Sequence, residues 1–237
     1  MIAPVVDAED LGEFLRRARA ALPEQALRSV SERLAVRRRW TLERAGSLQP
    51  MELFALTPAT RRLQGEQQAI WSRRLTPILS AIVAGDAETA IGTAGRFADR
   101  PAWLLDWMTF WLHQVDPSLP WWARWVYAPG ANTGALPLVL LEPQPAPAGD
   151  LVQGYRLLAG AWRFLADVVG AVQELREVEE VERPLVALAL VYLTYLYTLA
   201  SWRLTEEFTQ VLGPPEQVLD GLLGLRRWEV MQGVQQG

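Results

Sequence analysis

The segment from Pro184 to Trp202 constrains the fold most strongly, because its 19 residues carry no charge. A helix of this length is either just long enough to span a bilayer or is buried inside a helical protein. On a helix, its small and hydroxyl-bearing side chains share one stripe, opposite the bulky ones. We interpret the segment as a buried helix whose small side admits a close neighbour; a membrane helix packed through small residues is the alternative. The small stripe consists of Ala187, Val191, Thr194, Thr198, Ser201 and Thr205.

Signals for helix starts recur through the rest of the chain. Three aspartates precede apolar residues at three- and four-residue spacing, which is typical of helix N-caps. Two Thr-Pro pairs precede similar patterns, as a cap followed by a first-turn proline does. They are Asp7, Asp86, Asp150, Thr57-Pro58 and Thr76-Pro77. The sequence therefore predicts an all-α fold, a bundle-like array of about eight or nine helices. The predicted helices include residues 8–22, 24–46, 58–75, 77–84, 87–98, 101–115, 151–182, 185–212 and 215–232, and a short one ending at Tyr127.

Residues 128–149 interrupt the helical pattern, because they are rich in proline and glycine. The alternating prolines near the end of this stretch favour an extended segment, and the apolar residues 136–141 are expected to form a short strand or to line a partner groove. We predict a single helical domain over residues 1–237, with a possible sub-division into 1–127 and 150–237 joined by this loop.

Composition excludes several kinds of chemistry. The chain has no cysteine, so disulfides, thiol catalysis and thiolate metal sites are absent, and we expect a cytoplasmic location. All 23 basic residues are arginine, which we attribute mainly to codon usage. Residues 1–75 hold 13 arginines against 9 acids, whereas the remainder holds 10 against 18. An acidic partner would therefore contact the N-terminal third.

Tryptophan is the most unusual feature, with eleven residues. Six of them fall within one short stretch, where core packing, a partner interface, a ligand pocket and a bilayer interface are all conceivable. Trp121 and Trp122 would point about 100° apart on a helix, so we expect some of this aromatic surface to stay outside the core. The residues predicted to bind a partner are Trp103, Trp107, Trp111, Trp121, Trp122 and Trp125.

A second candidate surface is the arginine-rich helix from Arg28 to Arg44. One of its faces carries four residues at helical spacing: Arg33, Arg37, Trp40 and Arg44. A basic face with an embedded aromatic side chain suits phosphate contacts and base stacking. The alternative is a solvated face whose arginine stems cover apolar neighbours. The nucleic-acid hypothesis assigns these contacts to Arg33, Arg37, Arg38, Trp40 and Arg44.

No catalytic, cofactor or metal motif is present in the sequence. His113 is the only histidine, and a triad with Asp116 and Ser118 would crowd all three onto one helix end. We therefore expect no cofactor, and we place an adaptor or structural subunit of a larger assembly, binding protein partners through the Trp-rich surface, ahead of the other functions. A nucleic-acid-associated subunit is the first alternative, and an all-α enzyme or carrier with a Trp-lined apolar pocket is the second.

The passages SAIVAGDAETAIGTAGRF and LLAGAWRFLADVVGAV loosely resemble the helical collar of clamp-loader subunits. The resemblance covers only part of the chain and depends on helix-turn residues. It transfers no functional residue.

Overall fold

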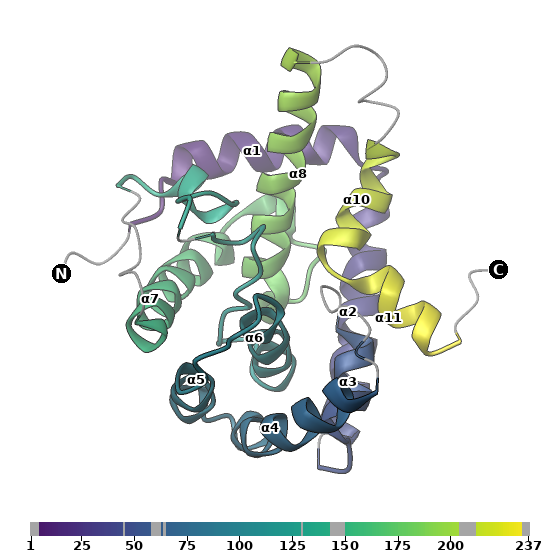
Figure 1. Cartoon of the computed structure of the whole chain (residues 1–237). Coiled ribbons are helices and arrows are strands. Elements are labelled where there is room, and N and C mark those ends of the chain that lie inside the picture. Colours follow the sequence, from purple (N-terminus) through teal and green to yellow (C-terminus); the bar gives the residue numbers. More distant parts are fainter. Residues whose placement is uncertain are drawn as a thin grey trace.

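The structure is a computed structural model that describes residues 5–44, 46–57, 63, 65–128, 130–142, 150–203 and 212–233, with side chains except at 199–203. Within these ranges the chain forms ten α-helices, three short 3₁₀ turns and no strand (Figure 1). The all-α prediction is therefore confirmed. The helices are α1 (Ala8–Ala21), α2 (Ala26–Arg44), α3 (Pro50–Leu56), α4 (Glu66–Val83), α5 (Ala87–Gly95), α6 (Trp103–Val115), α7 (Leu151–Gly170), α8 (Arg183–Arg203), α10 (Pro215–Leu222) and α11 (Leu225–Met231).

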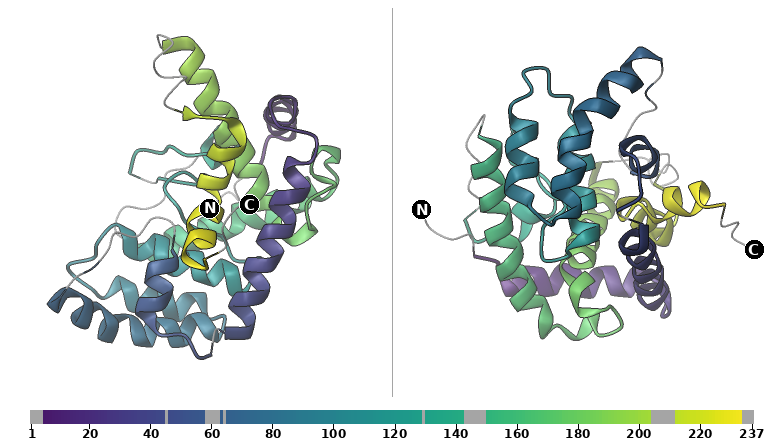
Figure 2. Two further views of the ribbon diagram at one scale, coloured as in Figure 1. Left: turned by 90° about the vertical axis from the view of Figure 1, so that its right-hand side faces the viewer. Right: turned by 90° about the horizontal axis from the view of Figure 1, so that it is seen from below.

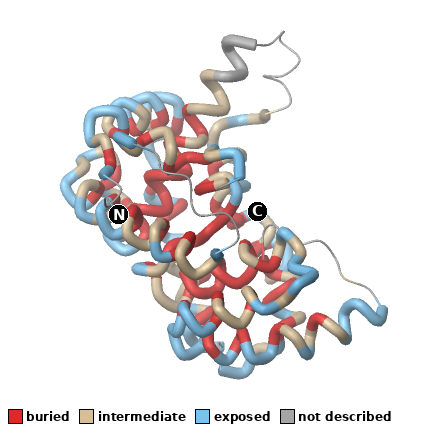
Figure 3. The backbone as a smooth tube through the Cα atoms, turned by 60° about the vertical axis from the view of Figure 1, so that its left-hand side comes forward, coloured by how far each residue is buried: buried red, intermediate tan, exposed pale blue. Residues whose placement is uncertain are grey.

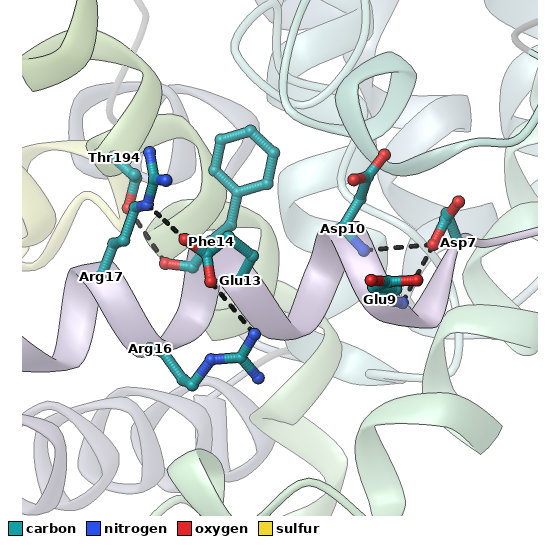
Figure 4. Close-up of polar contacts among 8 residues, drawn as sticks. All are labelled: Asp7, Glu9, Asp10, Glu13, Phe14, Arg16, Arg17 and Thr194. Atoms are coloured by element: carbon teal, nitrogen blue, oxygen red, sulfur yellow. Dashed lines mark hydrogen bonds and ion pairs between the residues drawn. The ribbon is translucent and has the colours of Figure 1, made fainter.

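Helix α8 runs through the middle of the fold, and α1, α7 and α10 pack around it (Figure 1). Every residue from Leu185 to Val191 is fully buried, which agrees with the predicted buried helix. Its small side faces α1, where the Thr194 hydroxyl donates to the Phe14 carbonyl over 3.1 Å (Figure 4). The side chains of Ser201 and Thr205, further along this stripe, lie outside the described part of the chain. In the part of the chain that the structure describes, no helix has the length and apolar character needed to cross a membrane.

The three predicted aspartate caps are all present. The Asp7 carboxylate accepts from the backbone N–H groups of Glu9 at 2.9 Å and Asp10 at 3.1 Å, at the start of α1 (Figure 4). Asp86 and Asp150 cap α5 and α7 in the same way, each accepting one N–H over 2.9 Å. These bonds satisfy donors that have no partner within the helix, so the local sequence determines where each helix begins.

Helix α4 corrects the expected break at Thr76-Pro77, because Pro77 lies inside it. A proline there removes one helical hydrogen bond and typically costs about 3 kcal/mol. The buried stripe from Trp71 through Leu75 and Ile78 to Ile82 continues across the proline, and its packing holds the helix together. The other expected start, at Pro58, lies outside the described residues.

Two more boundaries differ from the prediction. Helix α7 ends at Gly170, and two 3₁₀ turns lead from it to α8 in place of a helix to residue 182. The predicted last helix is divided at Gly224, whose left-handed backbone (φ 70°) ends α10 and begins α11. The short helix α3 was not predicted, and the predicted short helix ending at Tyr127 is not formed.

The stretch after residue 127 does not form the short strand that was one expectation. Residues Leu136–Val139 make a 3₁₀ turn, and Leu136 and Val139 are buried. The backbone is tied to the N-terminal segment by two hydrogen bonds, from Asp7 N–H to the Val139 carbonyl (2.7 Å) and from Leu141 N–H to the Val5 carbonyl (3.0 Å). Burial against α1 therefore fixes this part of the loop, and the prolines at 143, 145 and 147 lie outside the described residues.

Helices from both sides of residues 128–149 contribute to one hydrophobic core. Helices α4, α5 and α6 contact one another and α7 packs against α5 (Figure 2), while α2 contacts α6 and α11. Figure 3 shows buried segments facing inward between the helices and exposed ones on the outer turns. Four tryptophans of α6 and of the following segment lie in this interior, namely Trp107, Trp111, Trp121 and Trp122.

Candidate interaction site

Most of the predicted tryptophan surface is core. Trp107, Trp111, Trp121 and Trp122 are at most 4% exposed. The expectation that Trp121 or Trp122 stays outside is wrong, because residues 121–123 are not helical. They form an extended segment that is covered on both sides, so neighbouring side chains are buried in opposite directions.

The buried indoles are also fixed by hydrogen bonds. The Trp121 Nε1–H donates to the Asp106 carboxylate over 2.6 Å, and the Trp122 Nε1–H donates to the Tyr127 carbonyl over 3.1 Å. Trp111 Nε1–H donates to the Thr57 hydroxyl over 2.7 Å. The bonds of Trp111 and Trp121 join α6 to neighbouring segments, and the bond of Trp122 lies within its own segment, so all three have a structural role.

Two tryptophans of the set, Trp103 and Trp125, are half-buried. Trp103 packs edge-on against Phe54 and Trp71, with ring centroids 4.8 and 4.9 Å away. Trp125 lies between Trp121 and Tyr192 at 5.6 and 6.3 Å. Partner binding by the six tryptophans stays a prediction. Only these two of the six have side chains that a partner could reach in the folded protein.

The arginine helix α2 turns the predicted nucleic-acid face partly inward. Arg33 donates to the carboxylates of Asp220 and Glu229, each at 2.8 Å. Burial alone lowers its pKa, but the hydrogen bonds and charges of these two carboxylates outweigh that effect and raise it. Arg33 therefore holds the C-terminal helices to α2 and has little capacity left for phosphate.

Arg37 is completely buried. It donates to the Gln114 side chain over 2.9 Å and to the Leu223 carbonyl over 2.7 Å, and it lies over the Phe110 ring. Burial lowers the pKa of Arg37 to about 10, an effect that the negative charge of Glu182 opposes. No solvent-exposed phosphate can reach this guanidinium.

The rest of the predicted basic set lies further out. Trp40 is half-buried, with its ring edge-on to Trp228 at 6.4 Å, and Arg44 lies over its face at 5.2 Å. Arg38 is partly buried and Arg44 is exposed. The nucleic-acid hypothesis therefore keeps Arg38, Trp40 and Arg44 as accessible positions.

His113 belongs to a buried polar cluster. Its Nδ1 lies 2.9 Å from the Leu119 carbonyl, and its Nε2 lies 3.7 Å from the Glu182 carboxylate. Burial by itself raises the pKa of Glu182, but His113 and the charges of Arg37 and Arg38 together lower it below its ordinary value. The serine of the imagined triad is not bonded to His113; Ser118 donates its backbone N–H to Asp116. This arrangement is not a nucleophilic site.

Asp106 is the other strongly perturbed carboxyl. Burial raises its pKa from 3.8 to about 6, and the hydrogen bond from Trp121 partly opposes the rise. Such a shift can mark an acid-base residue. Asp106 is only 8% exposed, however, and lines none of the clefts between α3 and α11, α5 and α6, or α1 and α8. Among the described residues no three His, Asp or Glu side chains gather in a way that could hold a metal ion.

A groove lies between α3, the start of α4 and α11, and we name it the α3–α11 groove. Its volume is about 450 Å³, within the range of ligand-binding clefts. Two of the four methionines of the chain line it, and thioether side chains adapt to differently shaped apolar surfaces. The lining residues are Met51, Phe54, Ala55, Leu63, Gln68, Arg227 and Met231.

Aromatic packing stiffens the floor of the groove. Phe54 lines the groove and rests against half-buried Trp103, which in turn rests on Trp71. One of the predicted tryptophans therefore supports the groove from behind. Sequence reasoning missed the groove itself, because it forms where three segments meet that are far apart in the chain.

Arginine supplies the charge at the groove. Arg227 donates to the Ala55 carbonyl through Nε (3.3 Å) and NH2 (3.2 Å), which ties α11 to α3. Burial lowers the pKa of Arg227. On the same C-terminal helices the carboxylates of Asp220 and Glu229 are bound by Arg33. The lining among the described residues thus combines apolar surface with one cation and no acid.

In comparisons with known proteins, no family model, no curated protein and no solved structure matches the chain. The functional argument therefore depends on the geometry of this chain alone, and the resemblance to clamp-loader collars contributes nothing to it.

Proposed function

We propose that the protein is a helical adaptor that binds an amphipathic helix of a protein partner in the α3–α11 groove. The observation that carries the proposal is the groove itself, a cleft of about 450 Å³ in which apolar side chains, two of them methionines, lie beside polar groups. Apolar grooves between helices receive the apolar face of such a helix through side chains spaced three and four residues apart.

Charge supports a partner with an acidic residue beside its apolar anchors. Arg227 contributes the charge of the described lining, beside the apolar side chains that would hold the anchors. Arg226, exposed on the same helix, adds to the positive field. An acidic amphipathic helix therefore fits better than a basic one.

The proposal departs from a Trp-rich contact surface. The buried indoles are unavailable without unfolding, whereas the groove is open in the folded chain. Nucleic acid is less favoured as the main partner, because Arg33 and Arg37 are engaged inside the protein.

The test is site-specific photocrosslinking in the protein's own host. A photoreactive residue replaces Gln68, which lines the groove, or Gln67, its exposed neighbour on α4 that does not. We expect crosslinks to one protein from position 68 and not from position 67. The crosslinked peptide should have apolar residues at helical spacing and at least one acid.

Two variants on α11 complete the test. Met231→Glu places a charge in the groove, whereas Val230→Glu places the same charge on the adjacent exposed position outside its lining. We expect the first to abolish the crosslink and the second to preserve it. Crosslinks to nucleic acid, crosslinks to the same extent from both positions, or no crosslinks at all would overturn the proposal.

A further inference from the structure

A second cleft, of about 200 Å³, lies where the end of α5, the turn before α6, α6 itself and the first residue of α7 meet. It reaches the hydrophobic core, because Ala94, Leu104 and Met108 on its walls are at most 1% exposed. We name it the α5–α6 pocket. Its lining consists of Ala94, Arg100, Pro101, Ala102, Leu104, Leu105, Met108 and Leu151.

Arg100 is the one charged residue in this described lining. Its NH1 donates to the Gly95 carbonyl over 2.6 Å, which holds the guanidinium beside the pocket. Within the described ranges, its other nitrogens have no hydrogen-bond or ion-pair partner. The pocket therefore combines apolar walls with a cation that has no counter-ion among the described residues.

Three carboxylates close to Arg100 in sequence are already engaged. Asp106 accepts the Trp121 Nε1–H over 2.6 Å and does not line the pocket. Asp99 pairs with Arg74 at 2.9 Å, and Glu88 on α5 pairs with Arg156 of α7 at 2.9 Å. Neither is among the residues that line the pocket. The field at Arg100 therefore favours an anion from outside the chain.

Size limits the apolar part of such a ligand. A dry cavity of about 150 Å³ holds a benzene molecule, so 200 Å³ suits a group of about six to eight carbon atoms. We infer that the α5–α6 pocket binds a small monocarboxylate, with its compact apolar group inside and its carboxylate on Arg100. This inference is independent of the α3–α11 groove.

Methionine methyl groups give a readout specific to each site. Met108 lines the α5–α6 pocket, whereas Met51 and Met231 line the α3–α11 groove. The full chain labelled with ¹³C at its methionine methyl groups is titrated with hexanoate and, separately, with hexanamide. We expect both to move the Met108 signal, and hexanoate to bind about tenfold more tightly because its hydrogen bonds to Arg100 are charge-assisted.

Two arginine variants isolate the charge. Arg100→Gln should remove the preference for hexanoate and leave the binding of hexanamide unchanged. Arg96→Gln is the matched control, because Arg96 is exposed one turn earlier and is not part of the lining. It should retain the tenfold preference, so that net charge alone is excluded as the cause.

A third variant tests the volume. Ala102→Leu narrows the pocket from an exposed rim position, where folding tolerates the change, and should weaken both probes. Equal affinities for hexanoate and hexanamide in the unaltered chain would overturn the inference. So would equal loss of the preference in Arg96→Gln and Arg100→Gln, or shifts at Met51 and Met231 in place of Met108.

Discussion

Replacing the buried carboxyl of Asp106 by an amide should stabilise the protein near neutral pH. Burial raises the pKa of Asp106 from 3.8 to about 6. A folded-state pKa above the unfolded value means that the native state binds the proton more tightly. The resulting stability is complete below about pH 4 and is lost as the pH rises through 6. The shift of about two pKa units corresponds to roughly 3 kcal/mol by pH 8.

Asp106→Asn removes this dependence. The asparagine oxygen can still accept the hydrogen bond from Trp121, without a charge to bury. Urea unfolding at pH 8 should show the variant more stable than the unaltered chain by up to about 3 kcal/mol, and by less than about 1 kcal/mol at pH 4.

Asp167→Asn is the matched control, because Asp167 is an exposed carboxylate on α7. Its replacement removes the same charge from a solvated position, so the difference in stability should not depend on pH in this way. An Asp106→Asn variant less stable than the unaltered chain at pH 8 would refute the reasoning. It would mean that the hydrogen bond from Trp121 stabilises the ionised carboxylate by more free energy than its burial costs.

Three further predictions concern single features of the fold. Arg37→Met should destabilise by about 3–5 kcal/mol in urea unfolding, because buried hydrogen-bonding partners lose their donor, whereas Arg28→Met on the exposed side of α2 should stay within about 0.5 kcal/mol. Pro77→Ala should stabilise by about 2 kcal/mol, because the restored helical hydrogen bond outweighs the greater freedom of the unfolded chain; a lower unfolding midpoint would contradict this account. In single-tryptophan variants, acrylamide should quench Trp103 and Trp125 more than the four buried members of the predicted set, and equal quenching of all six would show that the burial pattern is wrong.

Helix starts could be predicted because they depend on local chemistry. Asp7, Asp86 and Asp150 cap helices with their own neighbours, so a few consecutive residues contain the whole signal. Pro77 shows the limit of this reasoning. The same local signal is present there, but the packing of a continuous apolar stripe overrides it.

The candidate site could not be predicted in the same way. In the sequence, Trp121 and Trp122 exceed the number of large aromatic side chains that one helix face can bury. In the fold, their segment is not helical and both side chains are buried. Arg37 looks solvated until the Leu223 carbonyl, 186 residues away, is seen to accept its hydrogen bond. Burial of such residues is decided by tertiary contacts that periodicity does not encode.

The bonds from Arg33 and Arg37 to the C-terminal helices also bear on how the chain folds during its synthesis. Both arginines are synthesised before their partners Asp220, Leu223 and Glu229, which follow them by 186 to 196 residues. Helix α1 likewise packs against α8, which is synthesised later. Because these guanidinium groups lack their carboxylate and carbonyl partners until the C-terminal helices have been synthesised, we expect the core around α2 to close only after α10 and α11 have formed.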